Sequence, residues 1–207
     1  MHSKTTTLII LLISFTALFL YLAMRINNSV ENKTKVNPVP KIEKSARLYF
    51  VPDTIIMNPY LIASSSSEMF IDTGSNKISA VQIEMSFNPD ILTIDSISGF
   101  NEDSFFGKQQ DFQVSIQNID NTNGRISFGV KINSDQAPKL GIGKLFNINF
   151  HAASPQMATQ NTQIKFLNKT VVVDPETDIS VLDTASPLNI EFNNGLDNNS
   201  SASESSK

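Results

Sequence analysis

Residues 80–87 have the sequence AVQIEMSF, and this stretch decides the fold. Its large apolar side chains, Val81, Ile83, Met85 and Phe87, alternate with small or polar ones. Because successive side chains of a β-strand point to opposite faces, the alternation predicts a strand with one buried face and one exposed face. The same period of two recurs along the chain, in the stretches 111–117, 125–132, 146–151, 164–166 and 188–192. No helical stripe of comparable length competes with these strands.

One of these stretches, 111–117, carries a prediction about individual side chains. Its alternation places Phe112, Val114 and Ile116 on the core side of the strand. The polar side chains between them are then expected on the outer side, namely Asp111, Gln113, Ser115 and Gln117.

Turn residues separate the predicted strands. Residues 120–124, DNTNG, predict a hairpin loop between 111–118 and 125–132, because Gly and Asn accept positive φ. Residues 72–76 and 88–90 predict two further turns. Strands with one apolar face cannot stand alone, so two sheets must cover each other across a common core. The sequence therefore predicts an all-β sandwich of about nine strands.

The composition excludes several function classes. The 207 residues include no Cys, which excludes disulfides, thiolate zinc sites and cysteine nucleophiles. There are two His, and because His2 lies at the N-terminus only His151 is left for a catalytic dyad. Residues 46–193 carry nine basic and sixteen acidic side chains, a sum of −7, which argues against nucleic-acid binding. We expect a protein that is not an enzyme and that uses no metal or other cofactor.

The N-terminal segment predicts a contact with a membrane. Residues 5–24 carry no charge, and as a helix they would span ~30 Å, the thickness of a bilayer core. We expect residues 1–25 to hold one transmembrane helix; a cleaved signal segment is the alternative and would give a secreted protein. Residues 26–45, rich in Asn, Lys and Pro, predict a flexible linker, and the Asn/Ser-rich residues 194–207 predict a disordered tail. The sandwich then occupies residues 46–193.

Four stretches of the sandwich region resemble one known family. They are residues 46–52, 70–81, 87–92 and 141–152, which hold an opening strand, a turn with the strand after it, an Asn-Pro-Asp bend and a glycine-led strand. Their order and spacing resemble the cohesin domain, the receptor module of cellulosome scaffolds. The serine run at residues 64–67 departs from the family, which tends to have a glycine-led turn there. The resemblance implies a jelly-roll-like sandwich of nine strands and a non-catalytic binding role.

The resemblance also implies a partner and a place in the cell. In the family, one sheet face receives the helical dockerin module of a partner protein. The strands that would form this face are 77–87, 111–117, 125–132 and 162–167. The residues expected to point outward from it are Gln82, Glu84, Gln113, Ser115, Gln117, Arg125, Ser127, Lys131 and Lys165. We then expect a single-pass membrane protein whose extracytoplasmic domain assembles proteins at the cell surface, with a link to polysaccharide degradation.

Three alternatives stay open. The nine outward residues are equally explained as the solvated sides of amphipathic strands. A carbohydrate-binding module of related fold would bind a polysaccharide through Asn and Asp hydrogen bonds, since the region has no Trp and its only Tyr are Tyr49 and Tyr60. A structural subunit of a surface appendage would instead polymerise by itself. Residues 120–124 superficially resemble a calcium loop, but a hairpin turn explains them.

Overall fold

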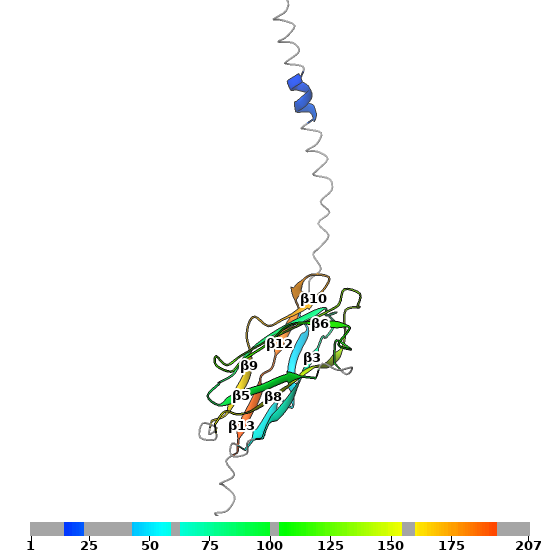
Figure 1. Cartoon of the computed structure of the whole chain (residues 1–207). Helices are drawn as coiled ribbons and strands as arrows, with labels where there is room; N and C mark the ends of the chain where they lie inside the picture. Colours follow the sequence, from blue (N-terminus) through cyan, green and yellow to red (C-terminus); the bar gives the residue numbers. More distant parts are fainter. Residues whose placement is uncertain (1–14, 23–42, 59–62, 100–103, 155–159, 194–207) are drawn as a thin grey trace, which may run out of the picture. The chain divides into compact units, whose positions relative to one another are not determined.

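The structure is a computed structural model that describes residues 15–22, 43–58, 63–99, 104–154 and 160–193. The chain divides into two units, Met1–Lys41 and Ile42–Lys207. In the first unit, residues 15–22 form a short helix (Figure 1). Within the described ranges, no helix is both long enough and apolar enough to cross a membrane. Most of the predicted membrane helix and linker, and all of the predicted tail, lie outside these ranges and stay predictions.

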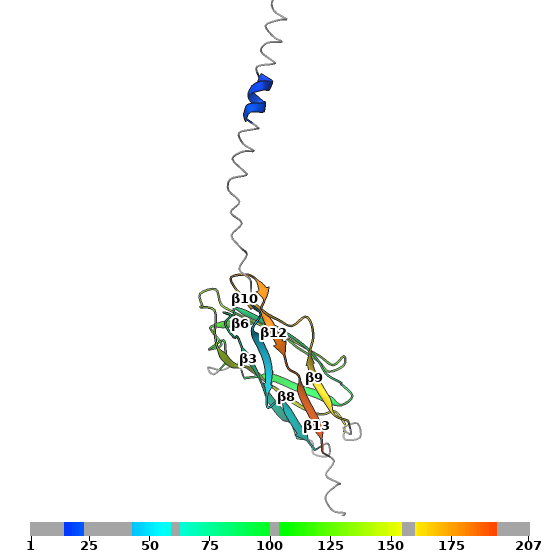
Figure 2. The ribbon, with the colours of Figure 1, turned by 180° about the vertical axis from the view of Figure 1, so that it is seen from behind.

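The second unit is built from two β-sheets, which Figures 1 and 2 show from opposite sides. The smaller sheet has five strands, in the order β12 (Leu182–Ala185), β1 (Ala46–Val51), β3 (Ser65–Asp72), β8 (Ile142–Ala152) and β5 (Leu92–Ser98). The larger sheet has eight, beginning with β6 (Phe112–Asp120), β7 (Arg125–Ile132) and β4 (Ala80–Ser86). Two strands share the other edge of β4: β10 (Val171–Asp174) and β9 (Thr162–Phe166). Beyond β10 lies β11 (Ile179–Ser180). Beyond β9 lie β13 (Leu188–Phe192) and then β2 (Thr54–Met57).

Both sheets turn an apolar face toward a shared core. Val81, Ile83 and Met85 of β4 are buried, as the alternation in the first quoted stretch predicts. Phe128 of β7 meets Phe146 of β8 across the gap between the sheets, with their ring centroids 4.7 Å apart. Burying each side chain of this size stabilises the fold by about 1.5–3 kcal/mol. The prediction of a two-sheet β-sandwich is therefore confirmed.

The number of strands differs from the nine expected, because the described residues contain strands β1 to β13. The excess arises largely where the chain changes sheets. β1 pairs in parallel with β12 in the smaller sheet, and after Pro52 the chain continues as β2, which pairs in parallel with β13 in the larger sheet. Pro52 and Pro187 lie at these two crossings. Proline has no N–H to donate to a strand ladder, so it ends pairing on one sheet.

Strand β6 departs from the predicted alternation through a β-bulge. Its register with β7 shifts between Val114 and Ile116, so the inward and outward positions exchange after Ser115. Ile116 pairs with Gly129 and is 39% exposed on the outer side, so its predicted core position is wrong. Gln117 falls on the inward parity, and its Nε2 donates a hydrogen bond to the Ile97 carbonyl of the facing sheet at 3.1 Å. Gln117 is exposed at this edge of the sheet, but it does not share the side of Gln113, so its predicted place among the outward residues of the face is wrong.

The hairpin between β6 and β7 lies where the sequence predicts it. Gly124 has a φ of +64°, and a Cβ there would lie 2.2 Å from the Phe87 carbonyl oxygen, so only glycine fits. Asp120 accepts hydrogen bonds from the Asn123 side chain and from the backbone N–H groups of Asn123 and Thr122. These bonds, led by that of the Asn123 side chain, hold the pKa of Asp120 below its ordinary value of 3.8. Hydrogen bonds within the turn thus account for the position and the lowered pKa of the Asp120 carboxylate.

Candidate docking face on the larger sheet

The outer side of β6, β7, β4 and β9, the candidate face, carries four rows of side chains. Strand register defines the rows, because residues that pair across a sheet point to the same side. In order along β7, the rows are Gln113 with Lys131 and Ala80; Ile116 with Gly129 and Gln82; Asn118 with Ser127 and Glu84; and Asp120 with Arg125, Ser86 and Lys165. The four strands that were expected to form one face therefore do lie in one sheet.

Eight of the nine predicted residues lie on this face. Seven of them occupy the rows themselves, and Ser115 sits in the bulge, where its Oγ lies 2.9 Å from the position that a Cβ on Gly129 would take. Gln117 is the exception, because it turns toward the smaller sheet. The alternation thus places eight of the nine residues on one side of the sheet, and their role in binding a partner stays a prediction.

Glu84 is held firmly at the centre of the face. Its Oε1 accepts a hydrogen bond from Gln82 Nε2 at 3.0 Å, and its Oε2 accepts one from Ser127 Oγ at 2.6 Å. Its backbone is held by Thr170, which is 5% exposed and whose Oγ1 donates to the Glu84 carbonyl at 3.0 Å and accepts from the Glu84 N–H at 3.1 Å. Thr170 thereby closes the gap where the neighbour of β4 changes from β9 to β10. Both carboxylate oxygens of Glu84 are therefore engaged within the protein.

The cations of the face are in the opposite situation. Arg125, Lys131 and Lys165 are exposed, as is Lys169 in the loop between β9 and β10. Across the described ranges, no hydrogen bond or ion pair engages any of these four side chains. The face thus carries four cations that form no ion pair with any described group, although Glu84 and Asp120 lie on the same face.

Sequence reasoning missed three residues of this region. Ile116 was assigned to the core, and Asn118 and Lys169 were not considered. A signal for Ile116 was present in the spacing of β6, where the apolar residues Ile116 and Ile119 are an odd number of positions apart. In a regular strand, two residues with that spacing cannot share a face, so one of them must be exposed unless a bulge intervenes.

A hollow of about 590 Å³ opens on the candidate face. It lies between the outer sides of β4 and β7 and the start of the β9–β10 loop. Its lining combines Glu84, Arg125 and Ser127 of the two strands with residues at the end of β9 and in the loop, namely Phe166, Leu167, Asn168 and Lys169. A hollow with apolar walls and cationic side chains is suited to receive a side chain that has an apolar stem and an anionic head.

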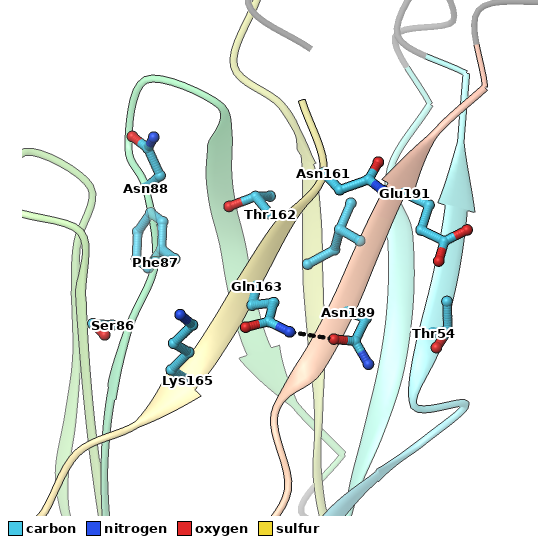
Figure 3. A pocket seen from close by; sticks show the side chains of 11 residues that line it. Thr54, Ser86, Phe87, Asn88, Asn161, Thr162, Gln163, Lys165, Asn189 and Glu191 are labelled. Carbon is cyan, nitrogen blue, oxygen red and sulfur yellow. Dashed lines mark hydrogen bonds between the residues drawn. The ribbon is translucent and has the colours of Figure 1, made fainter. Parts of the chain in front are cut away.

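A second groove, of about 580 Å³, lies farther along the same sheet over β9, β13 and β2 (Figure 3). Four of its eleven lining residues carry carboxamides, namely Asn88, Asn161, Gln163 and Asn189. Gln163 Nε2 donates a hydrogen bond to Asn189 Oδ1, as the dashed line in Figure 3 shows. Lys165 belongs to the lining of this groove as well as to the candidate face. The groove offers donors and acceptors but little apolar surface.

The described residues do not form a recognisable catalytic or metal centre. Within them, no group of three or more His, Asp or Glu is placed to hold a metal ion. His151 Nδ1 lies 2.7 Å from Asp95 Oδ1 on the smaller sheet, and Ser64 Oγ donates to the other oxygen of Asp95 at 2.9 Å. The hydroxyl therefore bonds the carboxylate and not the imidazole, which is not the order that activates a serine nucleophile.

A family model described as the cohesin domain matches residues 70–191, more than half of the chain. The chain belongs to the cohesin family. It is accordingly a non-catalytic binding module, as the sequence predicts. No curated protein matches the chain.

Solved cohesins have the same fold at low sequence identity. The cohesin CaCohA2 from Clostridium acetobutylicum is 18% identical, with a TM-score of 0.57 over 72% of this chain and 92% of that one. The third cohesin of ScaC, in complex with the ScaB dockerin from Acetivibrio cellulolyticus, is 17% identical, with a TM-score of 0.58 over 72% and 99%. The OlpA cohesin of Clostridium thermocellum, in complex with Doc918, is 9% identical, with a TM-score of 0.55 over 72% and 99%.

Proposed function

We propose that this cohesin module binds the dockerin module of a partner protein through the candidate face. The observation that carries the proposal is the arrangement of that face: Ile116 is exposed on the edge strand β6 beside Gly129, and their row lies between the rows of the unpaired cations Lys131 and Arg125. Protein interfaces commonly combine an apolar centre with a polar rim. The solved cohesins in complexes with ScaB dockerin and Doc918 support the choice of partner.

The face is suited to binding because it is rigid before the partner arrives. β4 lies in the middle of the sheet, and Glu84 within it is fixed through both its side chain and its backbone. Flanking strands hold Arg125, Ser127 and Lys131 in register on β7. The ordered strands lose little backbone entropy on association, while each exposed cation that a partner fixes costs about 0.5–1.5 kcal/mol.

The N-terminal segment supports a second part of the proposal, that the module is tethered to a membrane and works outside the cytoplasm. The uncharged residues 5–24 and the Pro-containing residues 26–45 have the compositions of an anchor and a spacer. A tethered dockerin receptor would collect partner proteins at the cell surface, and polysaccharide-degrading enzymes are the class that we propose. Protease treatment of intact cells tests this, because degradation of the module without lysis is expected and full protection contradicts an outside location.

The proposed binding is tested with the full chain in mild detergent and a panel of recombinant dockerins, including ScaB dockerin and Doc918. Isothermal titration calorimetry should find at least one dockerin that binds with a dissociation constant below about 1 μM. A Gly129→Arg variant places a large cation over the middle of the face and should lose this binding. A Ser66→Arg variant, at an exposed position of β3 in the smaller sheet, controls for the added charge. The proposal fails if no dockerin binds or if both variants lose binding equally.

A second candidate function is favoured by the carboxamide groove in Figure 3. Carboxamides both donate and accept hydrogen bonds, as sugar hydroxyls require, so the groove fits binding of a polysaccharide chain. Electrophoresis through gels that contain soluble polysaccharides separates the two candidates. Retardation that is lost in a Gln163→Ala and Asn189→Ala double variant would support glycan binding, while unretarded migration of the wild-type chain would exclude it for the polysaccharides used.

A further inference from the structure

We propose that the candidate face selects a partner helix that carries carboxylates on both sides of an apolar residue, so that the partner is acidic where this cohesin is basic. The inference rests on the proposed function and specifies the chemistry of the partner. Its central elements are the exposed Ile116 and the unpaired cations Arg125, Lys131 and Lys169.

The first argument is the uneven pairing of charge over the molecule. Residues 46–193 sum to −7, so free positive charge on one face is unexpected. In the described residues, the three ion pairs all lie on the smaller sheet, as Arg47–Asp72, Lys144–Glu68 and His151–Asp95. On the candidate face, Glu84 and Asp120 are engaged by neutral donors, which leaves the cations available. An acidic partner supplies the missing counter-charges and is steered to this face.

The second argument is the spacing of the cations. Lys131 and Arg125 lie on β7 six positions apart and on the same side, which corresponds to about 20 Å along the strand. Gly129, with Ile116 beside it, lies between them at about 7 Å from the Lys131 row. A helix rises 1.5 Å per residue, so a helix along β7 would span the two cations with about 13 residues. Its apolar contact residue would lie roughly one turn from one carboxylate and two to three turns from the other.

The third argument is the hollow of about 590 Å³ near Arg125. Arg125 and Lys169 both line it, and Phe166 and Leu167 supply apolar wall. Glu84 also lines it, but Gln82 and Ser127 already engage both of its oxygens. An Asp or Glu of the partner can therefore enter the hollow with its stem against the apolar wall and its carboxylate near two cations.

The apolar middle of the face favours a protein over other anionic ligands. Ile116 is 39% exposed and borders Gly129, which has no side chain, as well as the uncharged Ser115 and Gln82. Burying an isoleucine against a partner contributes only if the partner offers apolar surface. A nucleic acid or a polysulfated glycan would meet the cations but would leave Ile116 without a matching contact.

The test uses two fluorescent helical peptides with the full chain in mild detergent. One peptide has Glu near both ends, about 13 residues apart, and Leu between them; the other has Lys in place of Glu. Fluorescence anisotropy should show the acidic peptide binding about tenfold more tightly than the basic one. An Arg125→Glu and Lys131→Glu double variant should invert this preference. A Lys77→Glu and Lys139→Glu double variant changes the net charge equally outside the four strands and should keep it.

Each result bears on the inference. Stronger binding of the basic peptide, no binding of the acidic peptide, or a preference that the double variant does not change would overturn it. Binding of a short DNA duplex as tight as that of the acidic peptide would also overturn it, because charge alone would then explain the affinity. The proposed function is separable: a dockerin that binds with no loss in the Arg125→Glu and Lys131→Glu variant keeps that function and removes this inference. If the acidic peptide is preferred but no dockerin binds, this inference is kept and the proposed function is removed.

Discussion

The two outer faces of the sandwich differ in how their polar groups are satisfied. On the smaller sheet the charged side chains pair with one another, at 2.7 Å for Arg47–Asp72, 3.2 Å for Lys144–Glu68 and 2.7 Å for His151–Asp95. Its half-buried aromatic residues, Tyr49 and Phe70, stack on each other with ring centroids 5.8 Å apart. On the larger sheet, Arg125, Lys131 and Lys165 have no such partners in the described part of the chain.

This difference indicates which face is prepared for a partner. Exposed ion pairs contribute only about 0–1 kcal/mol each to folding, so the pairs of the smaller sheet add little stability. They do occupy the charges, and a partner would have to replace contacts that already exist. At the cations of the larger sheet a partner would displace water and not an existing ion pair within the described residues. Four predictions test this contrast, in order of decreasing expected effect.

The largest effect is expected from Thr170→Val, which tests the gap in the larger sheet. The substitution removes the hydroxyl that bonds both the N–H and the carbonyl of Glu84; the carbonyl keeps the Leu167 N–H at 2.7 Å, but the part-buried N–H loses the Thr170 hydroxyl as its acceptor. We expect a loss of about 2–3 kcal/mol in unfolding free energy, measured by urea denaturation. Thr184→Val on exposed β12 of the smaller sheet is the matched control and should change the value by less than about 0.5 kcal/mol. Equal losses of unfolding free energy in the two variants would show that the Thr170 hydroxyl is not needed where the neighbour of β4 changes from β9 to β10.

The second prediction compares two exposed isoleucines on opposite sheets. Ile116 is 39% exposed on the larger sheet, and Ile142 is 66% exposed on the smaller one. Ile116→Asp should weaken binding of the dockerin found in the calorimetric panel by about 30-fold, since it replaces the exposed apolar side chain of the proposed docking face with a charge. Ile142→Asp should change the affinity by less than about twofold. A larger loss of dockerin affinity in Ile142→Asp than in Ile116→Asp would contradict the proposed difference between the two faces.

The third prediction compares two glutamines of β6 that were both expected to point outward. Gln117 bonds the Ile97 carbonyl of the facing sheet, whereas Gln113 lies on the candidate face. Gln117→Ala should lower the unfolding free energy by about 1 kcal/mol and leave dockerin binding unchanged. Gln113→Ala should leave the unfolding free energy unchanged. Chemical denaturation and calorimetry on both variants separate the two roles, and a binding defect in Gln117→Ala would contradict the bulge.

The smallest effect concerns Arg47→Ala on the smaller sheet. The Gly74 N–H and then the Arg47 guanidinium hold the pKa of Asp72 below its ordinary value of 3.8. A carboxyl group with a depressed folded pKa contributes stability above its unfolded pKa and loses it as the pH falls through the folded pKa. Arg47→Ala raises the Asp72 pKa but does not restore it fully, because Gly74 remains. The variant should be less stable by about 0.5 kcal/mol near neutral pH, since Arg47 is 59% exposed. Urea unfolding at decreasing pH should show this difference vanish once Asp72 is protonated in both proteins.

Much of the fold could be predicted because its strands obey simple alternation. In β4 and β8, buried and exposed residues follow the period of two over most of their length, and the Gly124 hairpin lies where positive φ is required. The crossings at Pro52 and Pro187 could not be predicted in detail. They depend on which distant strand pairs with each side of the proline, and local residue patterns do not contain that information.

The candidate face was predictable in its strands but not in its central residue. A shift of one position in the register of a strand moves every later side chain to the other side of the sheet, so one missed bulge reverses all later assignments. The bulge at Ser115 is such a shift, and it exchanges Ile116 with Gln117. The sequence pattern alone treats an apolar residue as buried, so it assigned the exposed isoleucine to the core. Charge pairing was likewise beyond the sequence, since Arg47 and Asp72 are 25 positions apart.

The parallel contact between β2 and β13 constrains how the protein can be made. The Asn189 N–H donates to the Asp53 carbonyl at 2.8 Å, and these residues are 136 positions apart. Part of the larger sheet therefore lacks its neighbour until residues 188–192 have left the ribosome. A nascent chain that emerges N-terminus first keeps β2 unpaired for nearly the whole of synthesis. A chaperone that shields such edges would act on this protein up to the last strand, and premature termination before residue 188 would yield a chain prone to aggregation.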